Sequence, residues 1–136
     1  MEQKDYLLRE IEKIGFLLNE IFNILAGKGG NSSLTIENQF ADARALLLHE
    51  TGFDIDVFLL LEGSETEQYI SKFHSMNTSN IELLADIITT MGMSTESAGA
   101  KEYLQRALQL YELCNSSDKT FSFDRESKIS GIKNAL

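Results

Sequence analysis

Two histidines and one cysteine are the side chains best suited to metal binding or nucleophilic chemistry in this chain. His49 and Glu50 form the first half of the HExxH zinc motif, but the second histidine would fall at Phe53. His74 is remote in sequence, and a zinc site needs three or four ligands. We therefore predict no metal site.

The single cysteine, Cys114, falls near the end of a predicted helix and on its apolar row. The negative end of the helix dipole disfavours a thiolate, so we predict core packing for Cys114 rather than nucleophilic catalysis. One cysteine cannot form an intrachain disulfide, and the first residues are charged where a secretory signal would be apolar. These two features predict a cytoplasmic location.

Two further segments contain parts of ligand-binding loops. Asp54 and Asp56 have the spacing that opens a calcium loop, but Leu59 stands where that loop needs glycine. A helix-capping role is therefore predicted for Asp54. The GKGGNS segment has the ingredients of a phosphate-binding loop in the wrong order, and it follows a predicted helix instead of a strand. No catalytic residues and no cofactor are predicted, and an enzymatic activity is not favoured.

The net charge of −9 is unevenly distributed along the chain. Residues 31–118 carry 14 Asp and Glu against 4 Lys and Arg, whereas residues 119–136 carry 4 basic residues against 2 acidic ones. A phosphate backbone would be repelled by most of this surface, so we predict no nucleic-acid partner. The basic tail is expected to lie against an acidic neighbour, within the molecule or in another copy.

The spacing of the apolar residues predicts an all-α fold of about seven short amphipathic helices in an antiparallel array or bundle. The 136 residues fit a single domain, with a long N-terminal helix over 1–27, a glycine-rich linker over 28–33 and a helical array over 34–136. The longest strictly apolar run has five residues, far fewer than the roughly 20 that a membrane span needs, so no membrane partner is predicted.

Helix boundaries are predicted from capping residues. Ser64 with Glu67, and Ser79 with Glu82, have the spacing of a capping box, in which each side chain bonds the other's backbone donor. A corner between two short helices is expected at Gly63, and the last helix should begin around residue 122.

The segment of about residues 80–114 resembles a tetratricopeptide-repeat helix pair. It contains LLADIITTMG and, after a polar turn, AKEYLQRALQLYEL. Ala100, Leu104 and Ala107 match the small, large and small positions of the family's second helix, where small residues let paired helices approach closely. Ile88 departs from the family's preference for a small residue. An ordinary antiparallel helix pair explains the spacing as well. The whole chain also resembles small uncharacterised all-helical bacterial proteins, which implies no activity.

Some apolar residues lie outside the main row of their predicted helix. The five of interest are Leu17, Ile24, Tyr103, Leu110 and Leu113. They are either buried by neighbouring helices on both sides, or form an exposed surface for a partner. The functional prediction is a non-enzymatic interaction or scaffold module that binds a protein, a peptide or a second copy through an apolar groove with acidic surroundings. The alternatives are a small-ligand binder or enzyme whose site assembles only in the fold, and a structural subunit of a larger assembly.

Overall fold

The computed structural model describes residues 2–26, 36–94, 99–118 and 122–136. Within these ranges the chain forms helices and no strands, which confirms the all-α prediction. The seven helices found there are α1 (Glu2–Leu25), α2 (Ile36–Thr51), α3 (Ile55–Leu60), α4 (Ser64–Ser71), α5 (Thr78–Met93), α6 (Ala100–Asp118) and α7 (Phe123–Ala135). The predicted glycine-rich linker over 28–33 lies outside the described residues.

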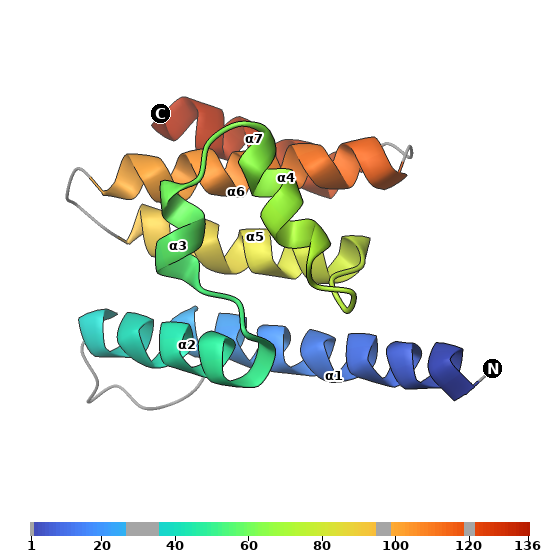
Figure 1. Ribbon diagram of the computed structural model, residues 1–136. Coiled ribbons are helices and arrows are strands. Elements are labelled where there is room, and N and C mark those ends of the chain that lie inside the picture. Colours follow the sequence, from blue (N-terminus) through green and yellow to red (C-terminus); the bar gives the residue numbers. More distant parts are fainter. Residues whose placement is uncertain (1, 27–35, 95–98, 119–121) are drawn as a thin grey trace.

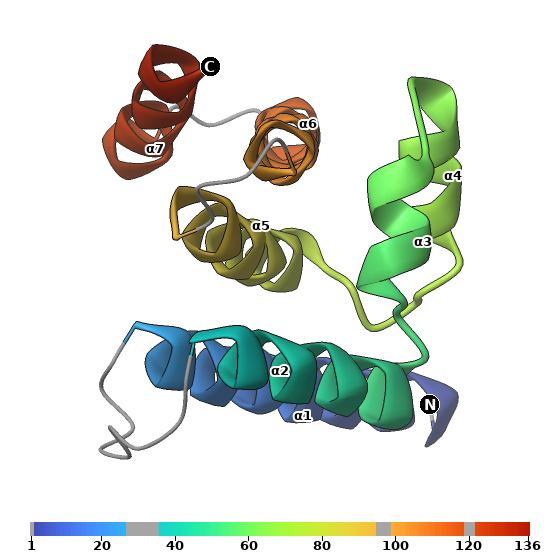
Figure 2. The same cartoon turned by 90° about the vertical axis from the view of Figure 1, so that its left-hand side faces the viewer.

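The helices are stacked around α5. Figure 1 shows α1 and α2 side by side and antiparallel along one edge, α5 above them and α6 beyond α5. Figure 2 shows α7 at the periphery beside α5 and α6, and the α3–α4 pair running across the ends of these layers on the opposite side. The helical packing is therefore that of a bundle.

The core lies on two sides of α5, where this helix packs against α1 and against α6. The apolar row of α1 includes the buried residues Ile14, Leu18 and Ile21, as expected for a helix with a 3.6-residue apolar repeat. Helix α5 is buried on more than one face, since it packs against both α1 and α6. A buried amide fixes its place against α1, because Asn80 Nδ2 donates to the Ile11 carbonyl oxygen at 2.9 Å.

Helices α5 and α6 form an antiparallel pair whose close approach depends on small residues. A Cβ atom added at Gly92 would lie 2.9 Å from both Leu104 Cδ2 and Tyr103 Cβ. Ala107, predicted to permit close approach, is completely buried. The small size of the side chains at this contact therefore sets the distance between the two helices.

The predicted caps are correct at two helices. Asp54 Oδ1 accepts from the Val57 amide at 3.2 Å at the start of α3, and Ser122 Oγ accepts from the Arg125 amide at 3.2 Å at the start of α7. The expected corner is present at Gly63, which has a φ of 57°, a backbone conformation that favours glycine.

Both predicted capping boxes are wrong. Helix α4 begins from Gly63 without a side-chain cap, so Ser64 is its first helical residue. At α5 the cap is Asn77, whose Oδ1 accepts from the Asn80 amide at 3.0 Å. The predicted cap lies two residues after the observed one, because serine and asparagine both cap helices well and spacing alone favoured Ser79.

No helix of the described residues is long and apolar enough to cross a membrane.

Candidate functional site

Two of the five predicted surface residues are inside the molecule. Leu110 has no exposed surface and Tyr103 is 8% exposed, so the expectation that they face a partner is wrong. Leu113 and Leu17 are half-buried beside the core. Only Ile24 is an exposed residue, with 45% of its surface accessible.

The α3–α4 pair explains the burial on α6. Its two helices are held together by a cluster of aromatic rings with centroids 5.2 to 6.0 Å apart: Phe53, Phe58, Tyr69 and Phe73. The Tyr69 hydroxyl also accepts from the Asp54 amide at 3.0 Å, which joins the two ends of the pair. Because this unit packs against α6 on the side away from α7, the second apolar face of α6 has an intramolecular cover.

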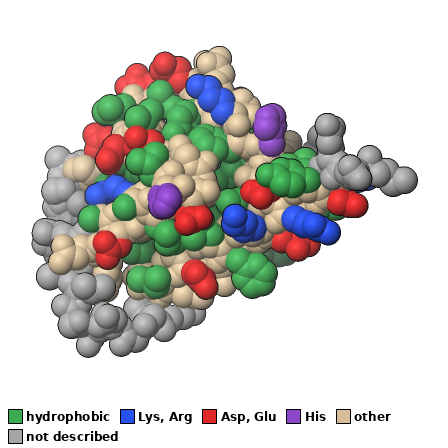
Figure 3. Space-filling model, turned by 60° about the horizontal axis from the view of Figure 1, so that its bottom comes forward, with side chains coloured by type: hydrophobic (Ala, Val, Ile, Leu, Met, Phe, Trp, Pro, Cys, Tyr) green, Lys and Arg blue, Asp and Glu red, His purple; other side chains and the backbone are tan. Residues whose placement is uncertain are grey.

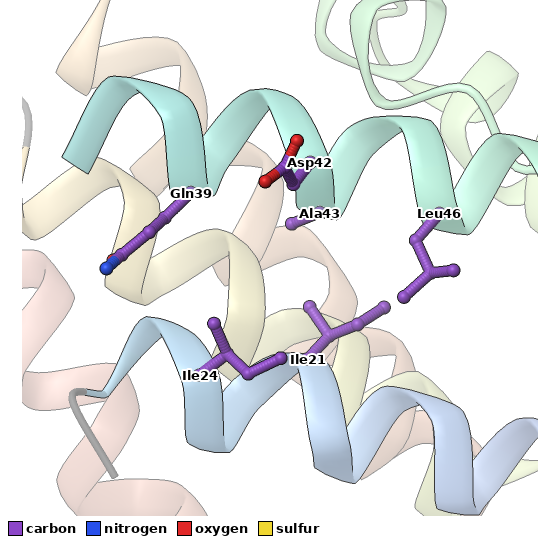
Figure 4. A pocket seen from close by; sticks show the side chains of 6 residues that line it. All are labelled: Ile21, Ile24, Gln39, Asp42, Ala43 and Leu46. Carbon is purple, nitrogen blue, oxygen red and sulfur yellow. The ribbon is translucent and has the colours of Figure 1, made fainter. Parts of the chain in front are cut away.

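Helices α1 and α2 leave an apolar pocket open between them. It has a volume of about 140 Å³, and Figure 4 shows the six residues that line it: Ile21, Ile24, Gln39, Asp42, Ala43 and Leu46. Ile21 and Ala43 form the buried part, whereas Ile24 and Leu46 are 45% and 36% exposed. We call this pocket the α1–α2 groove. It is too small for a drug-sized ligand but suits one large apolar side chain.

The α1–α2 groove has acidic surroundings. Asp42 lines it, and Glu20 is the only charged residue of α1 beyond Ile14. Arg44, the only basic residue of α2 besides His49, is directed elsewhere: its Nη2 donates to the Tyr103 hydroxyl at 2.7 Å. Figure 3 shows hydrophobic, acidic and basic side chains interspersed on the face that contains α1 and α2.

The sequence analysis found only the α1 side of this groove, through Ile24. The α2 side was not predicted, because Leu46 was not among the apolar residues considered for a partner surface. The run Leu46–Leu47–Leu48 carried a signal, since three consecutive leucines on a helix cannot all point at one neighbour. Leu47 is completely buried, while Leu46 and Leu48 are exposed on either side of it.

A second and more polar cleft lies between α4 and α6. Its volume is about 400 Å³, and its walls include Glu67 of α4 and Gln109, Glu112 and Leu113 of α6. Thr66 Oγ1 donates to Gln109 Oε1 at 3.2 Å, which ties the two walls together.

Arg106 lies behind this cleft and is 7% exposed. Its Nη1 donates to Gln109 Oε1 at 3.3 Å, but its buried Nε has no hydrogen-bond partner. Within the described ranges Arg106 has no ion pair, which is unusual because a buried guanidinium is normally paired with a carboxylate.

Helix α7 contributes the other buried arginine to a dense group of charges. Arg125 Nε and Nη2 donate to Glu82 Oε1 of α5 at 3.0 and 2.8 Å, and Nη2 also lies 3.3 Å from Asp118 Oδ2 of α6. Lys128 Nζ lies 3.0 Å from Glu82 Oε2 and 3.1 Å from Asp86 Oδ1. The basic tail therefore lies against an acidic neighbour within the same molecule.

These contacts shift the protonation equilibria of the paired groups. Burial alone would raise the pKa of Glu82, but hydrogen bonds from Arg125 and Lys128 outweigh burial and hold this pKa below its ordinary value. Burial would likewise lower the pKa of Lys128, and the hydrogen bonds to Glu82 and Asp86 raise it. Both partners are therefore charged at neutral pH.

Two residues beside this charged group favour their neutral forms. Burial, together with a hydrogen bond of 2.5 Å to Asp86 Oδ1, raises the pKa of the Tyr111 hydroxyl. Burial raises the pKa of the Cys114 thiol to about 11. Cys114 is completely buried, as the sequence predicted, and a neutral thiol in this position is a poor nucleophile.

The residues that sequence analysis weighed for metal chemistry are not brought together. His49 on α2 and His74 after α4 are both exposed, and Figure 3 shows the two imidazoles apart. In the part of the chain that the structure describes, no three His, Cys, Asp or Glu side chains are placed to hold a metal ion.

No protein-family model, curated protein or solved structure matches this chain. The groove, the cleft and the charged group are therefore the features that indicate a function.

Proposed function

We propose that this protein is a non-enzymatic interaction module that binds a basic amphipathic helix of a partner protein in the α1–α2 groove. One observation carries the proposal: Ile24 and Leu46 are exposed at the two ends of an apolar pocket (Figure 4), on a molecule in which Tyr103 and Leu110 of α6 are buried. Amphipathic helices commonly bind such grooves through a few apolar anchor residues.

The dimensions and charge of the groove define the partner. A volume of about 140 Å³ accommodates one leucine- or phenylalanine-sized anchor between Ile21 and Ala43. Asp42 in the lining and Glu20 nearby favour lysine or arginine beside that anchor, because complementary charges increase association rates and fix the register.

Leu46 and Leu48 make a matched pair of variants to test this proposal. Leu46→Asp places a charge in the groove, whereas Leu48→Asp places the same charge on an exposed residue of α2 outside it. The probes are helical peptides with one leucine anchor and flanking lysines, each paired with the same peptide carrying glutamates, and binding is followed by fluorescence anisotropy.

The wild type and Leu48→Asp should bind the lysine peptides, and Leu46→Asp should bind them at least about 30-fold more weakly, as for the loss of a central anchor contact. The proposal is wrong if both variants bind like the wild type, if both lose binding equally, or if the glutamate peptides bind as well as the lysine peptides. Concentration-dependent self-association abolished by Leu46→Asp would instead assign the groove to a second copy.

The tetratricopeptide resemblance over residues 80–114 and the cytoplasmic location belong to the same proposal. The closely packed, antiparallel α5–α6 pair with Ala107 at its contact supports the first. A single cysteine, present as a buried free thiol, supports a reducing compartment.

A further inference from the structure

Helix α7 is attached to the bundle mainly by charges. Its buried residues are Ile129, Ile132 and Arg125, so only two apolar side chains of the helix are buried. Among its other contacts with the described residues, Arg125 and Lys128 form an ionic group with α5 and α6. The burial of two isoleucines offsets only a small part of the conformational entropy that is lost when a whole helix is ordered.

The position of α7 allows it to move alone. It lies at the edge of the bundle, and neither view shows another helix on its outer side (Figures 1 and 2). Helix α7 packs mainly against α6. The long side chains of Arg125 and Lys128 extend to Glu82 of α5. The contacts that hold α1, α5 and α6 together do not pass through α7.

Charge balance makes this attachment depend on the two cations. Arg125 and Lys128 face Glu82 and Asp86 of α5 and Asp118 of α6. Within α7, Lys128 also pairs with Asp124 at 3.2 Å, and Glu126 accepts from Asn115 of α6 at 3.4 Å. Removing one cation leaves partly buried carboxylates facing each other, which costs far more than losing an exposed ion pair.

We propose that α7 is a detachable cover, locked by Arg125 and Lys128, which opens as a unit while the rest of the bundle stays folded. Its release uncovers Tyr111 and Cys114 of α6 together with the carboxylates of Glu82 and Asp86. Lys128 Nζ lies 5.8 Å from the centre of the Tyr111 ring, and Arg125 Nη1 donates to Oδ1 of Asn115, the residue after Cys114, at 3.0 Å. The uncovered face is therefore both apolar and acidic.

Hydrogen exchange of the intact wild-type protein tests the independent opening. Amides of α7 should exchange through an opening that requires less free energy than the opening that exposes the α5 amides. The free energy of the α7 opening should also depend less steeply on denaturant concentration. Equal exchange free energies and equal denaturant dependence for α7 and α5 would overturn the proposal, because α7 would then open only when the whole protein unfolds.

The single cysteine provides a second measurement, since labelling of Cys114 by a thiol reagent requires its exposure. Arg125→Gln should accelerate this labelling by about 30-fold or more, and the labelling should depend less steeply on denaturant than exchange in α5 does. Lys133→Gln is the matched control, because Lys133 is an exposed cation of the same helix outside the ionic group, and it should change labelling by less than about twofold.

Unchanged labelling in Arg125→Gln, or labelling with the same denaturant dependence as exchange in α5, would also overturn the cover. If Arg125→Gln does not fold, Lys128→Gln replaces it, and the wild-type exchange experiment decides the question without any substitution.

Discussion

Arg125 Nη2 lies 2.8 Å from Glu82 Oε1, and this contact joins two helices whose residues are 43 positions apart in the chain. The arginine side chain is 5% exposed and the glutamate side chain 20% exposed, so water screens the pair only partly. Arg106 is almost as deeply buried, yet it has no ion pair within the described residues. We therefore expect substitution of Arg125 to lower the free energy of unfolding, and substitution of Arg106 to leave it unchanged or raise it.

Removing either partner of the Glu82–Arg125 pair should destabilise the protein. Glu82→Gln and Arg125→Met should each lower the free energy of unfolding by about 3 kcal/mol, because each leaves a partly buried charge without its counter-ion. The double variant should lose clearly less than the sum of the two, as measured by urea unfolding in a double-mutant cycle. Additive losses would show that the two residues do not interact as the structure describes.

Replacing Arg106 by methionine should leave the stability unchanged or raise it by about 1 kcal/mol. The substitution removes a buried charge that no carboxylate balances, and methionine keeps an unbranched side chain of similar length. Gln109 Oε1 keeps the hydrogen bond from Thr66 in this variant. A loss of 2 kcal/mol or more in urea unfolding, an amount typical of a broken charge pair, would instead mean that Arg106 has a stabilising partner.

Two glycines should respond oppositely to alanine. Gly92→Ala should destabilise the protein by about 1 to 3 kcal/mol, because its Cβ would collide with Tyr103 and Leu104 where α5 meets α6. Gly131 is a helical residue of α7 with no atom within 4 Å of an added Cβ, so Gly131→Ala should stabilise the protein by about 0.5 to 1 kcal/mol. Thermal unfolding compares the two, and a stabilising Gly92→Ala would contradict the close approach of the helices.

Acid should weaken the attachment of α7 through Glu82. The folded state holds the pKa of Glu82 below its ordinary value of 4.5, so the stabilisation is present above that value and is lost as the pH falls through the lowered pKa. Unfolding free energies measured between pH 7 and pH 3 should therefore decline less steeply in Glu82→Gln than in the wild type. Identical pH profiles would mean that Glu82 contributes nothing to acid sensitivity.

Local features of the fold were predictable because they depend on residues close in sequence. The apolar repeat of α1 predicted a helix, and Ile14, Leu18 and Ile21 lie on its buried face. The caps at Asp54 and Ser122 were also correct, since each involves an oxygen and an amide three residues apart.

The partners of a helix face were not predictable in this way. Tyr103 and Leu110 were candidates for either burial or a partner surface, and both are buried, but the sequence pattern of α6 is the same whichever segment provides the cover. The same holds for the groove, where Ile24 was identified but its neighbour Leu46 depends on how α2 lies against α1.

The sequence by itself determined that the chain is helical, that helices begin after Asp54 and around residue 122, and that a basic tail follows an acidic middle. Only the tertiary structure decided which surplus apolar residues stay exposed, which carboxylates bind Arg125 and Lys128, and that Arg106 is buried without an ion pair among the described residues. Periodicity and capping are short-range properties of the backbone, whereas burial and ion pairing depend on contacts between segments tens of residues apart.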